Sequence, residues 1–134
     1  MPNFSRLIDV ARIFKVTKQT GRSFHVAFIL KGRKVITVGF NNFNKSNHIC
    51  KTYKPTRIHG ADYRACLHAE IDAAAKIKHR ENVRGLVMVS LRIDNKDRLA
   101  YAEPCPNCAY HLGKWGYTDV FYSTDCGKFK RIGY

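Results

Sequence analysis

The sequence HAE at residues 68–70 is followed by PCPNC at residues 104–108, and these two short segments decide the fold. A catalytic zinc ion takes three protein ligands and keeps a fourth position for water, and one imidazole with two thiolates is a well-attested set of three. The two segments supply this set as His68, Cys105 and Cys108. We therefore expect them to lie together in the folded chain.

The spacing within each segment favours this arrangement. Cys105 and Cys108 are three residues apart, so both sulfurs lie on one face if they occupy the first turn of a helix. Pro104 and Pro106 favour a helix start at this point, and the positive end of the helix favours thiolates. Glu70 follows the histidine by two residues and sits beside the metal without ligating it. It is therefore a candidate general acid and base.

With these residues the chain resembles the zinc-dependent cytidine deaminase superfamily, because H-x-E followed by P-C-x-x-C is the signature of the zinc nucleobase deaminases. The resemblance implies one catalytic Zn²⁺ and hydrolytic deamination. A zinc-activated hydroxide would attack the ring carbon that bears the amine, and Glu70 would carry the proton to the ring and the leaving ammonia. Two other interpretations of the C-x-x-C motif stay open, a structural zinc knuckle and a redox pair.

Length and composition indicate one domain over residues 1–134, long enough to bury its own core. The N-terminus lacks the pattern of an export signal, and no apolar run approaches the roughly 18 residues of a membrane span. We therefore expect a cytoplasmic protein without a membrane partner. Beyond the two candidate ligands, Cys50, Cys66 and Cys126 lack the spacing of a disulfide framework, so we interpret them as thiols.

The chain is strongly basic, and its acidic residues are concentrated in the C-terminal part of the sequence. Its 24 Lys and Arg residues against 10 Asp and Glu residues give a net charge of +14. Residues 1–57 hold 12 of the basic residues and a single acid, whereas residues 58–134 hold the other 12 together with nine acids. A field of this kind attracts polyanions, although solubility alone is an alternative explanation.

Hydrophobic periodicity and turn residues place the elements along the chain. We expect an amphipathic helix over residues 3–19, an antiparallel hairpin from strands 24–31 and 34–40, a long loop over 41–64, a helix over 66–80 that carries Glu70, a buried strand over 86–93 with a turn after it, a helix over 106–115, and strands over 120–124 and from 129 onward.

This order resembles the deaminase superfamily, an α/β fold with α-β-α layers in which helices flank a mixed five-stranded sheet. The last two strands are separated by too few residues for a parallel crossover, so they should form an antiparallel hairpin. In that respect the chain resembles free-nucleoside cytidine deaminases and several bacterial toxin deaminases. It departs from the dCMP, tRNA-adenosine and AID/APOBEC branches.

Four residues are candidates for substrate contact. An Asn that ends the second strand commonly contacts the sugar in the superfamily, so Asn41 is the first candidate and Asn42 the second. Turn chemistry is the alternative explanation for both. His25 on the first strand is a candidate for the pocket wall, with a satisfied core histidine as the alternative. Ala69 resembles the residue whose backbone contacts the base.

The loop over residues 43–57 combines basic and aromatic side chains and contains no acid. Single-stranded nucleic acids need this combination, because cations neutralise phosphates while rings stack on bases. The candidate nucleic-acid contacts are Lys45, Lys51, Tyr53, Lys54 and Arg57. A solvated loop is one alternative, and a second, structural zinc bound by His48, Cys50, His59 and Cys66 is another.

The leading interpretation is a cytosine deaminase that acts on single-stranded DNA or RNA. The first rival is an enzyme for free cytidine, deoxycytidine or dCMP in pyrimidine salvage. A tRNA-type adenosine deaminase is a second rival, because residues 68–71 and 103–105 resemble those enzymes locally. A basic binding module with a structural zinc is the non-enzymatic rival. By resemblance alone, a homo-oligomer is expected.

Overall fold

The computed structural model describes residues 2–18, 24–41, 69–77, 85–104, 106–117 and 119–132, with the backbone alone at 106–108 and 111. In chain order its elements are α1 (Phe4–Lys18), β1 (Phe24–Lys31), β2 (Lys34–Phe40), α3 (Ala69–Ala75), β3 (Leu86–Ile93), β4 (Leu99–Ala100), α4 (Pro106–Lys114), β5 (Asp119–Ser123) and β6 (Phe129–Ile132). Within these ranges no helix has the length and apolar character that a membrane crossing requires.

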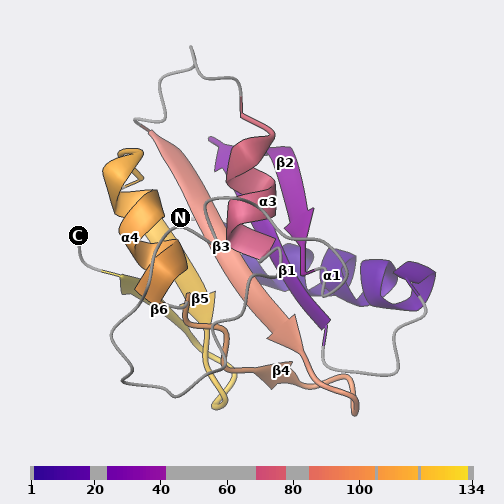
Figure 1. Ribbon diagram of the computed structural model, residues 1–134. Helices are drawn as coiled ribbons and strands as arrows, with labels where there is room; N and C mark the ends of the chain where they lie inside the picture. Colours follow the sequence, from indigo (N-terminus) through magenta and orange to yellow (C-terminus); the bar gives the residue numbers. More distant parts are fainter. Residues whose placement is uncertain are drawn as a thin grey trace.

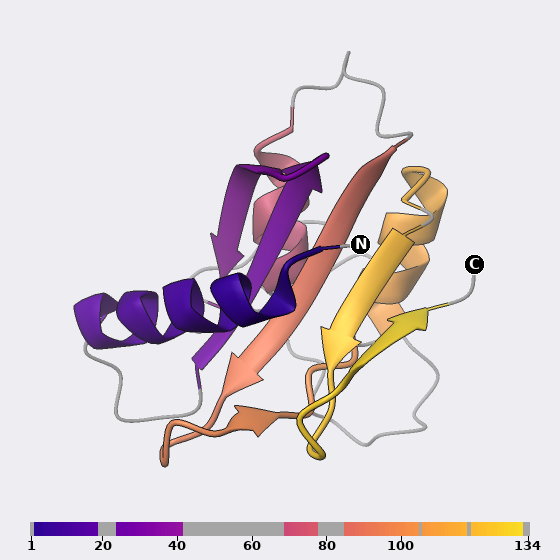
Figure 2. The ribbon, with the colours of Figure 1, turned by 180° about the vertical axis from the view of Figure 1, so that it is seen from behind.

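A mixed sheet with the order β2-β1-β3-β5-β6 forms the centre of the fold. β1 pairs antiparallel with both β2 and β3, β3 pairs parallel with β5, and β5 pairs antiparallel with β6. Helices α3 and α4 lie on one face of the sheet (Figure 1), and α1 crosses the opposite face (Figure 2). The mixed sheet, its flanking helices and the final antiparallel hairpin confirm the predictions from sequence.

The two faces of the sheet bury two separate apolar clusters. One lies under α3 and α4 and includes Ala27, Ile29 and Met88, while the other lies under α1 and includes Phe28 and Val89. Adjacent residues of one strand enter different clusters because side chains alternate between faces along a strand. The central strands β1 and β3 are therefore apolar along nearly their whole length, since both of their faces are covered.

One predicted boundary is wrong, and one strand was not predicted. The helix predicted to reach residue 80 ends at Ala75, where the amides of Lys76 and Ile77 turn to carbonyls three residues back. The turn after β3 leads into β4, a strand that the sequence analysis missed, which pairs with Arg92 and Ile93. It escaped notice because two residues carry no alternating pattern. Most of the predicted loop over 41–64 lies outside the described residues.

Candidate active site

Helix α3 is pressed directly against strand β2 at Gly39. A Cβ atom on Gly39 would lie 2.8 Å from the Cα of Ala73 and closer still to Ala69 O and Ala73 N. Glycine is therefore required here for a steric reason, since any side chain would push the helix away from the sheet. The small side chains of Ala69 and Ala73 allow the same close approach from the helix.

Hydrogen bonds from β2 and the residue after it then fix the helix along its length. Thr37 Oγ1 donates to Ala73 O at 3.0 Å, and Lys76 Nζ donates to Val38 O at 2.6 Å. Phe40 N donates to Asp72 Oδ2 at 2.9 Å. At the first turn, the amide of Ala69 donates to Asn41 Oδ1 at 2.8 Å. The helix that carries Glu70 is thus held from its first described residue to its end.

Glu70 points from α3 into the sheet and is almost completely buried, with 1% of its surface exposed. The hydroxyl of Ser90, on β3, donates to Glu70 Oε1 at 2.7 Å. The Nε2 atom of His25, on β1, lies 3.0 Å from the same Oε1 and 2.6 Å from Ser90 Oγ. Three buried polar side chains from three elements therefore form one connected cluster, the Glu70 cluster, in an otherwise apolar layer.

The environment of Glu70 keeps its carboxyl group ionised. Burial alone raises its pKa, but the charge and hydrogen bond of His25, with hydrogen bonds from Ser90 and from the Glu70 amide, outweigh it and lower the pKa to about 2. At neutral pH the group is thus a carboxylate, the form that accepts a proton. A buried carboxylate without such donors would be strongly destabilising.

The segment that leads into the Pro-Cys motif crosses the ends of β3 and β5. Ser123 Oγ donates to Ala100 O at 2.6 Å, and the amide of Ala102 donates to Ser123 O at 2.9 Å. The segment reaches Pro104, which is buried, and α4 begins two residues later. Both α3 and α4 begin near the carboxyl end of β3 (Figure 1), the edge at which open α/β sheets hold their sites.

The structure brings together four of the predicted site residues: His25, Asn41, Ala69 and Glu70. His25 contacts Glu70 and Ser90, and the oxygen of Asn41 binds the first described amide of α3. Ser90 was missed, although a lone polar residue within LVMVSLRI was a signal that could have revealed it. The remaining predicted residues lie outside the described residues or have an undescribed side chain, namely Asn42, Lys45, Lys51, Tyr53, Lys54, Arg57, His68, Cys105 and Cys108.

A family profile described as the "cytidine and deoxycytidylate deaminase zinc-binding region" matches residues 5–124. The chain belongs to this family. It is therefore a zinc-dependent hydrolytic deaminase whose family site holds one Zn²⁺. No curated protein sequence matches the deaminase significantly.

Solved structures show the same fold at low sequence identity. Cytidine deaminase from Mycobacterium leprae is 17% identical with a TM-score of 0.57, over 96% of this chain and 92% of that one. The dCMP deaminase from cyanophage S-TIM5, in complex with dCMP and dUMP, is 22% identical with a TM-score of 0.56, over 88% of this chain and 78% of that one. At these identities the similarity shows the fold alone.

One cation of the deaminase lies on the same face of the sheet as the Glu70 cluster. Arg92 follows Ser90 by two positions in β3 and pairs directly with His25 across to β1, so all three share a face. Its side chain is partly buried. Among the described residues no hydrogen bond or ion pair engages its guanidinium group.

Proposed function

We propose that the deaminase converts cytosine to uracil in single-stranded DNA or RNA. The family supplies the reaction, and the basic charge of the chain supplies the preference for a polymeric substrate. The observation that carries the proposal is the net charge of +14, which far exceeds what one phosphate group requires.

The chemistry of the donor set fits the metal of the family. His68, Cys105 and Cys108 would hold the zinc ion, because an imidazole with two thiolates is an established catalytic set. The described backbone supports this assignment, since α3 begins one residue after His68 and Cys108 lies in the first turn of α4. When bound, the zinc ion supplies a Lewis acid that activates water for attack on the ring carbon bearing the amine.

Glu70 is the residue that we propose to move protons. It is ionised and lies in the first turn of α3, two residues after the proposed ligand His68. Such a carboxylate can take a proton from the attacking water and return it to the ring and to the departing ammonia. Glu70 is 1% exposed, so bulk water has almost no contact with it.

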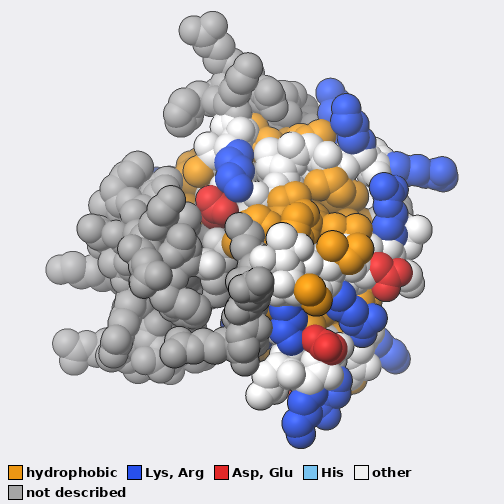
Figure 3. Space-filling view, turned by 90° about the vertical axis from the view of Figure 1, so that its right-hand side faces the viewer, with side chains coloured by type: hydrophobic (Ala, Val, Ile, Leu, Met, Phe, Trp, Pro, Cys, Tyr) orange, Lys and Arg blue, Asp and Glu red, His pale blue; other side chains and the backbone are white. Residues whose placement is uncertain are grey.

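Arg92 supports a substrate that carries phosphate. Its guanidinium group can bind phosphate oxygens in a bidentate manner, and it extends from the strand position next to His25. In Figure 3, Lys and Arg side chains lie above, to the right of and below the apolar centre of the face on the right of Figure 1, with fewer Asp and Glu side chains among them. Both features favour an anionic substrate over an uncharged nucleoside.

The rival function, deamination of free cytidine, deoxycytidine or dCMP, has support of its own. The family description names both cytidine and deoxycytidylate. The final antiparallel hairpin of β5 and β6 favours the free nucleosides among these substrates. dCMP would also satisfy Arg92, because it carries one phosphate. The two functions therefore differ in the number of phosphates that the protein contacts.

A substrate panel separates these functions. The zinc-loaded protein is incubated with cytidine, dCMP, single-stranded DNA, RNA and duplex DNA, and the conversion of cytosine to uracil and of adenine to inosine is read by mass spectrometry. We expect the highest kcat/KM on a single-stranded polymer. Activity confined to cytidine or dCMP would refute the polymer proposal, and conversion of adenine alone would refute the base assignment.

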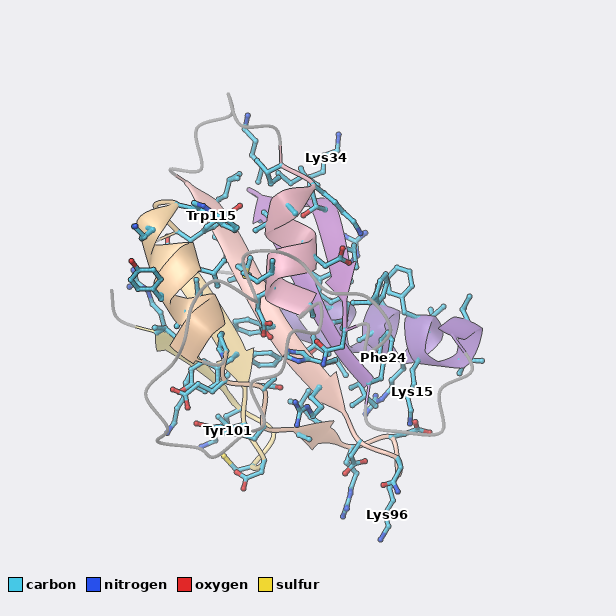
Figure 4. All side chains as sticks on the ribbon, in the orientation of Figure 1. Lys15, Phe24, Lys34, Lys96, Tyr101 and Trp115 are labelled. Carbon is cyan, nitrogen blue, oxygen red and sulfur yellow. The ribbon has the colours of Figure 1, made fainter. Side chains whose placement is uncertain are left out.

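The same panel tests Arg92 with two variants. Arg92→Ala should raise KM for phosphate-bearing substrates on the order of tenfold and leave KM for cytidine unchanged, since a charge-assisted hydrogen bond contributes about 1.5–3 kcal/mol. Lys34→Ala is the control, because Lys34 lies at the opposite end of the sheet from Tyr101 and Lys96 (Figure 4). An equal KM change for cytidine and dCMP would contradict the phosphate contact.

A further inference from the structure

The side-chain contacts of the Glu70 cluster are unequal between the two oxygens of the carboxylate. Ser90 and His25 both approach Oε1 of Glu70, at 2.7 Å and 3.0 Å. Neither side chain bonds to Oε2. These two side chains therefore hold the carboxylate by one oxygen, from the side of the sheet.

The hydrogen atoms available on Ser90 and His25 determine which atom donates and which accepts in each bond of the cluster. Ser90 has one hydroxyl hydrogen and gives it to Oε1, since its other acceptor, Ala102 O, is farther away at 3.4 Å. Ser90 Oγ must then accept the bond from His25, so the Nε2 atom of His25 carries a hydrogen. That hydrogen is shared between Ser90 Oγ and Glu70 Oε1.

The positions of the two donors are themselves fixed by the sheet. Ser90 and His25 lie on adjacent strands, with Ser90 opposite Ala27 and His25 opposite Arg92 in the antiparallel pairing. Ser90 is fully buried, and the side chain of His25 is 8% exposed. Side chains on adjacent central strands move little relative to one another. They can therefore fix the direction of a carboxylate that reaches them from a helix.

We propose that Ser90 and His25 are positioning residues that hold Glu70 by Oε1 and aim Oε2 at the reacting groups. This inference rests on the proposed role of Glu70 as the proton carrier. A carboxylate free to rotate would spend only part of its time in the geometry for proton transfer, and a misplacement of about 1 Å can cost on the order of 100-fold in rate. Ser90 contributes the shorter bond and His25 the longer one.

The variants Ser90→Ala and Ser90→Thr test the role of Ser90. The alanine variant removes the hydroxyl, so kcat should fall about 10- to 100-fold while KM and zinc content stay at wild-type values. The threonine variant keeps a hydroxyl at the same atom and should recover most of the lost kcat. The readouts are steady-state kinetics on the best substrate of the panel, zinc per chain by mass spectrometry, and melting temperature.

A matched control separates positioning from stability. Thr124 is also a buried residue, and its hydroxyl donates to Lys128 O at 2.8 Å in the turn between β5 and β6. Thr124→Val removes that hydroxyl without touching the Glu70 cluster, so it should lower the melting temperature and leave kcat unchanged. If Ser90→Ala likewise lowers only the melting temperature, the positioning role is wrong.

The role of His25 is tested by His25→Gln and His25→Leu. Glutamine keeps a donor near Nε2 and should retain more kcat than leucine, which has no donor. A crystal structure of the zinc-loaded Ser90→Ala protein gives a readout without turnover, because the Glu70 carboxylate should adopt a new orientation. An unchanged carboxylate would overturn the inference. Failure of the proposed function is distinct from this outcome. Activity of the wild type confined to cytidine or dCMP would refute the polymer proposal, and the positioning role would then be measured on that substrate.

Discussion

At the scale of single residues, Glu70 carries the chemistry that we propose, so replacing its carboxylate should abolish most of the activity. Glu70→Gln keeps the size of the side chain and removes its ability to accept a proton. We expect kcat to fall by roughly 10²- to 10⁴-fold, the usual contribution of a general acid and base. The measurement is uracil formation by mass spectrometry.

Zinc content and melting temperature serve as controls for this variant. Both should remain close to wild type, because glutamine can still accept the Ser90 hydroxyl at its amide oxygen. Activity of Glu70→Gln within tenfold of the wild type would contradict the assignment of Glu70 as the proton carrier.

The sequence predicted Glu70 but not all of the side chains that hold it. The H-x-E motif identifies the carboxylate because its spacing from the histidine has a chemical reason. Ser90 has no such motif, and its role depends on the pairing of β1 with β3, which places His25 and Ser90 on one face. Since register arises from long-range pairing, His25 could be predicted only as a candidate pocket residue.

At the scale of elements, the contact between β2 and α3 sets the position of Glu70. Gly39→Ala should disturb it, because the new Cβ would collide with backbone atoms of Ala69 and Ala73. We expect a loss of about 1–3 kcal/mol in the free energy of unfolding, as for other overpacked sites. The shift of α3 should also lower kcat for the folded protein. Denaturant unfolding and steady-state kinetics measure the two effects.

Gly85→Ala is the control for this substitution. Gly85 has a φ of +85°, and a Cβ added to it would meet no atom of the described residues within 4 Å beyond its chain neighbours. Alanine there therefore costs backbone strain without a collision. It should lower stability and leave kcat intact. If Gly39→Ala keeps wild-type kcat, the close contact does not set the geometry of the site.

The elements themselves were largely predictable, and so were most of their ends. Strands β1, β2 and β3 follow apolar and β-branched runs, and their predicted bounds match the structure. Helix α3 ends at Ala75, and the side chain of the next residue, Lys76, donates to Val38 O on β2. Such a contact joins residues far apart in sequence, so local patterns cannot predict it.

At the scale of the whole molecule, we propose that charge selects which substrates approach the site. The layers and the final hairpin followed from the order of elements, but the distribution of charge in space did not. Lys15, for example, falls on the polar side of the amphipathic pattern predicted for residues 3–19. In the structure it is buried, and its Nζ atom donates to Asp94 O and to Asp97 Oδ1 at 2.7 Å and 2.8 Å.

The net charge of +14 predicts that affinity for a polynucleotide depends steeply on salt concentration. If a single-stranded substrate contacts about four phosphates, the logarithm of its affinity should fall with a slope near −3 against the logarithm of salt concentration. Affinity for a cytosine-containing oligonucleotide should then drop about 50-fold between about 50 mM and 200 mM salt. Fluorescence anisotropy with the zinc-loaded Glu70→Gln protein measures this binding without turnover.

Two comparisons make the salt experiment decisive. Arg92→Ala should reduce the magnitude of the slope by about 0.7, the share of one phosphate on a single strand, whereas Lys34→Ala should leave it unchanged. The KM of the wild type for cytidine should not respond to salt, because cytidine carries no charge. An oligonucleotide affinity that is equally insensitive to salt would mean that the basic residues do not contact the substrate, and the polymer proposal would fail.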